Sequence, residues 1–190
     1  GEISFDDPAS DLTKNTLSTL NLIKYGIAKK VKKILFASSM SVYGNVPNQA
    51  INESYLPSPV SCYGISKLTS ERYLGIFKDK LPYINLRMFN VYGPGQDLSN
   101  LRQGMVSIFL AQALKEERVH VKGSLDRFRD FIYIDDVVDA WYRLCLNDSK
   151  NISINIGTGR RATVEELLLI IKENIKGVNS LIQGFQMIQS

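Results

Sequence analysis

Short apolar runs alternate along the chain with longer segments in which apolar residues recur every three or four positions. The helical spacing predicts helices over residues 8–29, 61–80, 102–116, 135–146 and 163–176. The short apolar runs predict strands over residues 33–39, 83–92, 118–123, 130–134 and 152–157. Strands that alternate with helices of this length indicate an α/β fold with a largely parallel sheet. Ligands of such sheets gather at the carboxyl ends of the strands.

Polar residues mark where several of these helices begin. The sequence DDP at 6–8 places an aspartate cap before a proline in the first helical turn. Asp135 is expected to cap the fourth helix, and Thr163 with Glu166 has the spacing of a capping box at the fifth. Residues 44–60 hold three prolines and are predicted to form a long loop. Loops of this length inside compact domains are usually functional.

The composition is that of a globular protein with one sizeable core: 190 residues, 44% hydrophobic and 22% charged. Much of the +4 net charge lies in AKKVKK at 28–33. A solvated helix end explains these lysines better than a nucleic-acid surface, because no aromatic residues interleave with them. Cys62 and Cys145 form no CxxC pair and there is one histidine, which indicates a reducing, cytoplasmic setting with no zinc site. Residues 1–10 lack the apolar centre of a signal peptide, and no apolar run reaches membrane-spanning length.

Two stretches place a tyrosine four residues before a lysine: Tyr25 and Lys29 in KYGIAK, and Tyr63 and Lys67 in CYGISK. Residues four apart share one helix face, and a nearby ammonium lowers the pKa of a phenol, which makes a usable acid or base. The spacing alone is weak evidence. Context favours the second pair, because Tyr63 follows a strand that ends at Ser39 and opens the crossover helix above the strand ends. Tyr25 and Lys29 are expected on a helix surface, away from those ends.

Several ordered motifs resemble the extended short-chain dehydrogenases/reductases, in the branch that modifies nucleotide sugars. Ser39, Tyr63 and Lys67 in FASSMSVYG and CYGISK resemble the Ser/Tyr/Lys triad of that family. Other pieces that match in order are NTLSTLNLI with Asn15, LRMFNVYGPG, RDFIYIDDVVDA and INIGTG. The resemblance covers residues 8–176. It implies a partial Rossmann-like fold, doubly wound with a mostly parallel sheet, together with part of the family's small substrate-binding region.

The resemblance implies NAD as the cofactor and gives each triad residue a role. The equivalent of Tyr63 exchanges a proton with a sugar hydroxyl. The equivalent of Lys67 bonds the nicotinamide ribose and lowers the pKa of the tyrosine. The equivalent of Ser39 holds the sugar oxygen and passes the proton. We assign Ser38, with Tyr63 and Lys67, to the cofactor site.

By the same resemblance, the nucleotide-sugar substrate is bound by Ser39, Met40, Ser41, Asn90 and Arg129. Asn90 is expected to bond the diphosphate, with a turn former before GPG as the alternative. Arg129 in RDF is expected to grip the diphosphate, because a planar guanidinium forks onto phosphate oxygens. Arg127 is a nearby competitor for this role. A surface ion pair of Arg129 with Asp126 or Asp130 is the structural alternative.

The residues after Ser39 bear on the type of reaction. Dehydratases and decarboxylases of this branch carry an acidic residue there, whereas this chain has Met40 and Ser41. The resemblance therefore favours 4-epimerisation of a UDP-sugar, in which C4 is oxidised and the hydride returns to the other face. A nucleotide-sugar 4,6-dehydratase or a keto-sugar reductase remains an alternative. A non-catalytic binding or oligomerisation fragment is an alternative from another class.

One family feature has no counterpart in the sequence. The thirteen glycines contain no G-x-x-G-x-x-G, the turn that receives the cofactor pyrophosphate. We therefore expect the chain to begin after the first β/α units and to bind NAD weakly or not at all. The family's second phosphate-binding arginine also has no match in 177–190. The resemblance implies a homodimer through the helices at 8–29 and 61–80.

These inferences give one expected domain over residues 1–176, followed by a tail at 177–190 that carries no clear signal. The expected Rossmann part is mainly 8–95 and 130–157, and the expected substrate-binding part is mainly 96–129 and 158–176.

Overall fold

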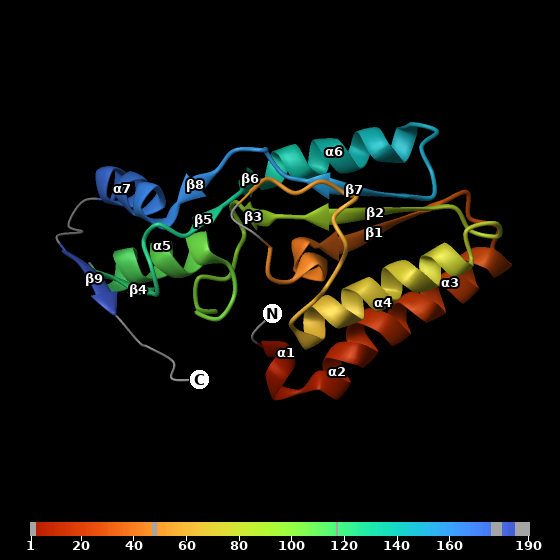
Figure 1. Ribbon diagram of the computed structural model, residues 1–190, viewed down its shortest axis with the longest axis horizontal. Helices are drawn as coiled ribbons and strands as arrows, with labels where there is room; N and C mark the ends of the chain where they lie inside the picture. Colours follow the sequence, from red (N-terminus) through yellow and green to blue (C-terminus); the bar gives the residue numbers. More distant parts are fainter. Residues whose placement is uncertain (1–2, 47–48, 117, 176–179, 185–190) are drawn as a thin grey trace. The chain divides into compact units, whose positions relative to one another are not determined.

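The computed structural model describes residues 3–46, 49–116, 118–175 and 180–184 (Figure 1). The chain forms two compact units, and each is made of two stretches of sequence. Unit 1 comprises Gly1–Phe89 and Asp135–Ile156, and unit 2 comprises Asn90–Ile134 and Gly157–Ser190.

Unit 1 is built on a parallel three-stranded sheet in the order β1–β2–β7. Its strands are β1 (Ile34–Ser39), β2 (Tyr83–Met88) and β7 (Ile152–Ile156). Ser39 pairs with Met88 and Met88 with Ile156, so the three carboxyl ends lie at one edge. Helices α3 (Ser18–Ala28) and α4 (Cys62–Ile76) lie on one side of the sheet and α6 (Ile134–Leu146) on the other (Figure 1). The predicted α/β class with a parallel sheet is confirmed.

The helix predicted over 8–29 is one continuous run with a wider turn inside it. After α1 (Ile3–Asp6), α2 (Pro8–Leu12) begins behind Asp7, whose side chain accepts a hydrogen bond from the backbone N–H of Ser10 at 2.9 Å. The expected aspartate cap and first-turn proline are therefore present. The segment η1 (Thr13–Leu17) has π-helical geometry before α3 continues. Single π turns inside helices often occur at functional sites.

A compact apolar cluster fastens α3 and α4 to the sheet of unit 1. Its fully buried members are Ile23, Leu74 and Leu81. The partly buried side chains that pack against them are Ile27, Ile34, Phe36, Tyr73, Phe77 and Tyr83. Burying each large apolar side chain contributes about 1.5–3 kcal/mol, so this cluster holds α4 firmly against β1 and β2.

The single strand predicted over 83–92 is wrong, because the chain divides at Phe89. The Phe89 N–H donates to the carbonyl of Ile156 at 3.0 Å and ends the ladder of unit 1. The next residues form β3 (Asn90–Tyr92) in unit 2, paired in parallel with β6 (Phe131–Tyr133). The partner strand therefore changes from β7 to β6 within one continuous apolar run, and apolarity alone does not predict this change.

In its described residues, unit 2 combines short strands with two helices. Its remaining elements are α5 (Met105–Glu116), β4 (Arg118–Lys122), β5 (Phe128–Arg129), β8 (Ala162–Thr163), α7 (Val164–Asn174) and β9 (Ser180–Gly184). Strand β5 pairs with β8 in antiparallel fashion, and β4 pairs with β9 in parallel. Its core consists of Phe109, Ala113, Val119, Val121, Val164, Leu168 and Ile171.

Two helix starts and the tail were tested by the structure. The capping box at α7 is confirmed, since Thr163 Oγ1 accepts from Glu166 N at 3.0 Å and Glu166 Oε2 accepts from Thr163 N at 2.7 Å. Helix α6 begins at Ile134, so Asp135 lies in the first turn instead of capping it. The tail at 177–190, for which the sequence carries no clear signal, contains β9, while residues 177–179 and 185–190 lie outside the described part. None of the described helices is long and apolar enough to cross a membrane.

A glycine allows α4 to approach the segment that follows β1. This segment, η2 (Met40–Tyr43), lies so close that a Cβ on Gly64 would be 2.5 Å from the Ser41 carbonyl oxygen. It would also be 3.0 Å from the Pro59 Cβ. Because backbone atoms cannot rotate away as side chains do, only glycine permits this approach at position 64.

We expect Gly64→Ala to lower the free energy of unfolding by about 1–3 kcal/mol, the usual cost of overpacking. Gly75→Ala on the same helix is the matched control. A Cβ there meets only the Tyr83 hydroxyl, at 3.7 Å, so removing a helical glycine should stabilise by about 0.5–1 kcal/mol. Urea unfolding measures both. Equal effects from the two substitutions would contradict a close approach at Gly64.

Candidate active site

Helix α4 presents three ionisable side chains on one face. Ser61 caps the helix, because its Oγ accepts from the Gly64 N–H at 3.0 Å. Tyr63, Lys67 and Glu71 then follow at intervals of four residues, which stacks them along one side of the helix. The helix therefore delivers a phenol, an ammonium and a carboxylate in a row.

The carboxyl end of β1 meets this face through two adjacent serines. Ser39 caps η2: its Oγ accepts from the Ser41 N–H at 3.2 Å and donates to Ser41 Oγ at 3.2 Å. Ser38 is 1% exposed, and its Oγ donates to Glu71 Oε1 at 2.5 Å. The expected meeting of β1 with the Tyr63 helix at the strand ends is therefore observed.

Tyr63 carries a pKa that is raised above the usual value of a phenol. Burial is the main cause, the Asp11 carboxylate adds to it, and a side-chain hydrogen bond with Ser39 opposes both. The sequence predicted a lowered pKa because of Lys67. Desolvation instead dominates, since it penalises the phenolate more than the neighbouring groups stabilise it. In this structure Tyr63 is a proton donor at neutral pH.

Lys67 lies against aromatic rings. Its Nζ is 5.1 Å from the Phe36 ring centroid and 5.4 Å from that of Tyr63. Burial lowers the pKa of Lys67, and the charge of Asp11 counteracts this effect. Among the described residues Lys67 donates no hydrogen bond to a protein oxygen, so its three N–H donors can serve ligand hydroxyls.

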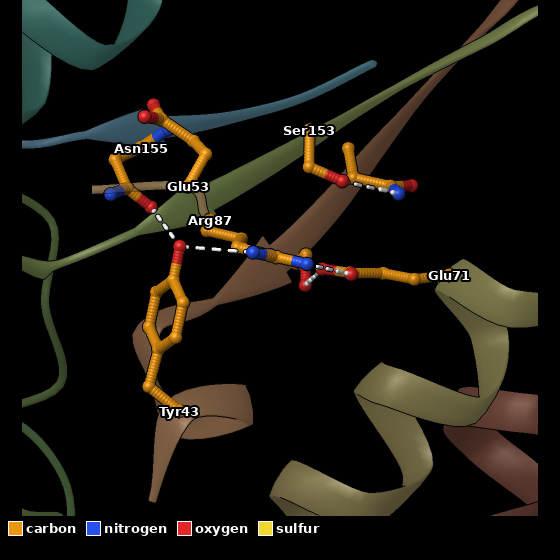
Figure 2. A network of polar contacts seen from close by, with 8 residues as sticks. Tyr43, Glu53, Glu71, Arg87, Ser153 and Asn155 are labelled. Atoms are coloured by element: carbon orange, nitrogen blue, oxygen red, sulfur yellow. Dashed lines mark hydrogen bonds and ion pairs between the residues drawn. The ribbon is translucent and has the colours of Figure 1, made fainter. Parts of the chain in front are cut away.

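A buried ion pair joins Glu71 to β2. Arg87 Nη2 donates to Glu71 Oε2 at 2.6 Å and Arg87 Nε donates to Glu71 Oε1 at 3.0 Å, with side chains 7% and 4% exposed. Figure 2 shows the guanidinium between the Glu71 carboxylate and the Tyr43 hydroxyl, to which Nη1 donates at 2.9 Å. Burial alone lowers the pKa of Arg87, but the bonds and charge of Glu71 and Tyr43 reverse this and raise it.

The same network reaches β7 and the long loop. The Tyr43 hydroxyl donates to Asn155 Oδ1 at 2.7 Å (Figure 2). The Asn155 backbone N–H donates to Glu53 Oε1 at 2.7 Å, and its side chain donates to the carbonyl of Ile51 at 3.3 Å. The predicted loop over 44–60 is thereby tied to the edge of the sheet where Ser39 lies.

Sequence reasoning missed Arg87, Glu71 and Tyr43. A signal was present, because an arginine inside the apolar run YINLRM must find a buried acceptor. Glu71 stands one helical turn after Lys67, which made it the available partner.

The twin pair lies on a helix surface, as expected. Tyr25 is 60% exposed on α3, and Lys29 forms the C-cap of that helix with its Nζ 6.0 Å from the Tyr25 ring centroid. Tyr25 and Lys29 share the local sequence of the site but neither its burial nor its serine partner.

Asn90 and Arg129 belong to unit 2, whereas the serines, Tyr63 and Lys67 belong to unit 1. Asn90 Nδ2 donates to the carbonyl of Asp130 at 3.0 Å. Arg129 is half-buried, and its Nη1 donates to the carbonyl of Phe128 at 2.8 Å. Burial, with a smaller contribution from Arg127, lowers the pKa of Arg129. Within the described residues Arg129 forms no ion pair, contrary to the surface ion-pair alternative.

Asp130 holds the turn that the GTG sequence forms after β7. Its Oδ1 accepts from the backbone N–H and the hydroxyl of Thr158 at 2.9 and 2.7 Å, and its Oδ2 accepts from the Gly159 N–H at 2.8 Å. Gly159 has a φ of +72°, a conformation that glycine adopts without strain. Asp130 therefore fixes a turn and is not the partner of Arg129.

Comparison with known proteins gives a consistent set of likenesses. Residues 2–157 match the sequence model of a family described as the NAD dependent epimerase/dehydratase family. A putative UDP-glucose 4-epimerase of Methanocaldococcus jannaschii is 36% identical over 175 residues, which are 90% of this chain and 56% of that protein. A GDP-6-deoxy-D-talose 4-dehydrogenase of Aggregatibacter actinomycetemcomitans is 32% identical over 88% of this chain and 56% of its own length. The chain thus spans about half the length of the curated relatives it matches.

A solved structure gives the same fold. A UDP-glucose 4-epimerase of Thermotoga maritima, with UDP-glucose, superposes with a TM-score of 0.89 at 38% identity. The match covers 96% of this chain and 60% of that one. The predicted partial Rossmann-like fold is confirmed.

The buried pair predicts strong coupling between Glu71 and Arg87. Glu71→Met or Arg87→Met alone should lower the free energy of unfolding by about 3–5 kcal/mol, because each leaves one buried charge unpaired. The double substitution should cost clearly less than the sum of the two. Urea unfolding of the four proteins gives the coupling energy.

The matched control is the exposed pair of Arg143 and Asp139 in unit 1, at 2.7 Å with side chains 76% and 57% exposed. Its double-mutant cycle should give only about 0.3–0.5 kcal/mol. Additive losses at Glu71 and Arg87 would show that the two side chains do not act as a pair.

Proposed function

Because the chain belongs to the NAD-dependent epimerase/dehydratase family, we propose that it carries the proton-transfer centre of a nucleotide-sugar 4-epimerase acting on UDP-sugars. The observation that carries this proposal is the meeting of Ser39, Tyr63 and Lys67 at the carboxyl end of the parallel sheet. Ser39 lies close enough to the Tyr63 phenol to lower its pKa against the effect of burial, and the Lys67 ammonium lies 5.4 Å from the centre of the Tyr63 ring.

The described residues fit NAD on its nicotinamide side. Lys67 offers three donors that no protein oxygen engages within the described chain, which suits the hydroxyls of a ribose. Ser38 is committed to Glu71 through its side chain, so its proposed part in cofactor binding falls to its backbone. NAD, when bound, supplies reversible acceptance of the hydride from C4 of the sugar.

Tyr63 is proposed to manage the proton that accompanies this hydride. In the oxidation half, its phenolate takes the proton of the C4 hydroxyl, and in the reduction half its phenol returns a proton to the C4 oxygen. Ser39, which bonds the same phenol, holds the sugar oxygen and passes the proton. Because the pKa of Tyr63 is raised in this structure, the phenolate needs cationic compensation from Lys67 and the loaded site.

The residues next to Ser39 support epimerisation over dehydration. Met40 and Ser41 lie in η2, and Ser41 Oγ accepts from Ser39 Oγ at 3.2 Å. Neither side chain can supply the carboxyl group that elimination of water from the sugar requires. Both remain proposed contacts of the sugar.

Unit 2 is proposed to hold the diphosphate part of the substrate. Arg129 is half-buried, and its guanidinium faces no carboxylate in the described residues, which leaves its fork available for phosphate oxygens. Arg127 is engaged with the carbonyls of Ser124 and Lys122, which favours Arg129 over it. Asn90 is the second proposed diphosphate ligand.

A keto-sugar reductase is a second candidate. It is favoured by the 32% identity to a relative named as a 4-dehydrogenase. The same Tyr63 and Lys67 would serve that reaction, and only the fate of the hydride would differ. Incubation with UDP-glucose and NAD separates the two, because an epimerase forms UDP-galactose with no net reduction of NAD, whereas a reductase running in reverse would form a keto sugar and NADH.

The sharpest test of the proposed role is Tyr63→Phe, assayed with UDP-glucose and with NAD in large excess to offset the weak cofactor binding expected without a Gly-rich turn. We expect kcat to fall by roughly 10²–10⁴-fold, the usual contribution of a general acid–base, with nucleotide-sugar binding retained. Tyr25→Phe is the matched control, since it removes the same hydroxyl from the twin motif and should leave kcat unchanged. A Tyr63→Phe protein with full activity would refute the role of this phenol.

We also propose a homodimer through α3 and α4. Large apolar side chains are exposed on both helices: Leu22, Tyr25, Ile65 and Ile76. Burying such a surface against a second copy would remove it from water. We expect light scattering to report a dimer and Leu22→Glu to produce monomers. Val138→Glu on α6, also at an exposed apolar residue, should leave the dimer intact. A monomeric native chain at high concentration would contradict the dimer.

A further inference from the structure

Asp11 on α2 has an unusual carboxylate. Its Oδ1 accepts from Asn15 Nδ2 at 3.1 Å, and the same amide donates to the Asp11 carbonyl at 3.1 Å. Its Oδ2 is buried and has no hydrogen-bond partner among the described residues. A buried charged oxygen without a partner is destabilising, so this oxygen requires an explanation.

The helix segment that carries Asp11 is fastened to the helix that carries Tyr63 and Lys67. Thr16 Oγ1 donates to the carbonyl of Ser66 at 3.1 Å, and Ser70 Oγ donates to the carbonyl of Asn15 at 3.1 Å. Thr16, Ser66 and Ser70 are all buried. These bonds hold the backbone of η1, and hence Asp11 one turn before it, in a fixed position against α4.

The charge of Asp11 acts on both members of the candidate catalytic pair. It raises the pKa of Tyr63 and, against the effect of burial, raises the pKa of Lys67. A carboxylate that disfavours the phenolate and favours the ammonium keeps both groups protonated.

Other charged residues lie on α4 itself and on the elements that contact it. They are Asp6 of α1, Asp7 of α2, Lys14 of η1, Glu71 and Arg72 of α4, and Arg87 of β2. Glu71 is the other carboxylate that could serve as the counter-charge of Lys67, because it lies one helical turn after Lys67. Both of its oxygens are instead taken by Arg87 and Ser38. Because Glu71 is bonded to Arg87, it is not available to pair with Lys67.

We propose that Asp11 is a positioning residue of the Tyr63–Lys67 pair, with its unpartnered oxygen as the counter-charge of the Lys67 ammonium. Glu71 is excluded from this role by Arg87. This inference rests on the proposed function only in that Tyr63 and Lys67 are taken as the catalytic pair. Its consequence is that, before cofactor and substrate bind, Tyr63 is a protonated phenol beside a charged lysine.

The test is a pH titration by NMR of the chain labelled with ¹³C at the lysine Cε and the tyrosine Cζ. Asp11→Asn keeps an oxygen for the Asn15 amide but removes the charge, so the pKa of Lys67 and that of Tyr63 should both fall. Asp7→Asn is the matched control. It removes one charge from the same helix start and keeps a capping side chain, so neither pKa should move.

Two further variants keep the test decisive. Ser39→Ala should raise the pKa of Tyr63, opposite in sign to Asp11→Asn, because it removes the bond that favours the phenolate. The double variant Glu71→Gln/Arg87→Gln should leave the pKa of Lys67 unchanged. Should Asp11→Asn fail to fold, Asp11→Ser removes the same charge and is read in the same way.

Unchanged values in the Asp11 variants, or equal shifts in Asp7→Asn, would overturn the proposal. A fall in the pKa of Lys67 in the Glu71/Arg87 double variant would also overturn it, because Glu71 would then be the counter-charge. This readout needs neither NAD nor sugar, so its failure is distinct from failure of the proposed epimerase activity.

Discussion

The ion pair of Glu71 with Arg87 fixes how the helix that carries Tyr63 meets the sheet. The attraction between two buried charges offsets the cost of removing them from water only if their hydrogen-bonding groups are also satisfied. Here the two side chains are nearly inaccessible to water, and both oxygens of Glu71 are bonded. Ser38 adds the end of β1 to the pair, and Tyr43 adds η2. A helix, two strands and the turn after Ser39 thus share one network, and a shift of any one of them would leave a buried charge unsatisfied.

The contrast between CYGISK and KYGIAK shows what this anchoring adds to a local motif. In both, a glycine follows the tyrosine. The Cβ position of Gly64 points at the backbone of Ser41, whereas that of Gly26 points at the flexible Leu81 side chain, 3.0 Å away. The first glycine permits contact with the strand end and its serine, and the second only accommodates a core side chain. The chemistry depends on the residues that a second element, here the end of β1, places beside the helix. The six-residue motif alone does not specify them.

Much of the fold was predictable, because strand and helix periodicity in α/β proteins is strong. The parallel sheet, the capping box at Thr163 and the approach of β1 to Tyr63 were all anticipated. The break at Phe89 was missed because the apolar run continues while the partner strand changes. Strand β9 was missed because it depends on pairing with β4. The raised pKa of Tyr63 was missed because burial, which sequence spacing does not report, outweighs a neighbouring charge. Arg87 in an apolar strand was a readable signal that needed a buried acceptor.

A lysine held charged by Asp11 and a serine beside the phenol suit a reaction in which Tyr63 moves only protons, first as the phenolate that accepts one and then as the phenol that returns it. The hydrogen on C4 then leaves and returns as hydride without meeting solvent. The most direct measurement follows UDP-glucose carrying deuterium at C4, turned over with NAD in ordinary water. UDP-galactose that retains the deuterium at C4 is the predicted result. Loss of deuterium to solvent, or no change of configuration at C4, would contradict a hydride-based epimerase centred on Tyr63.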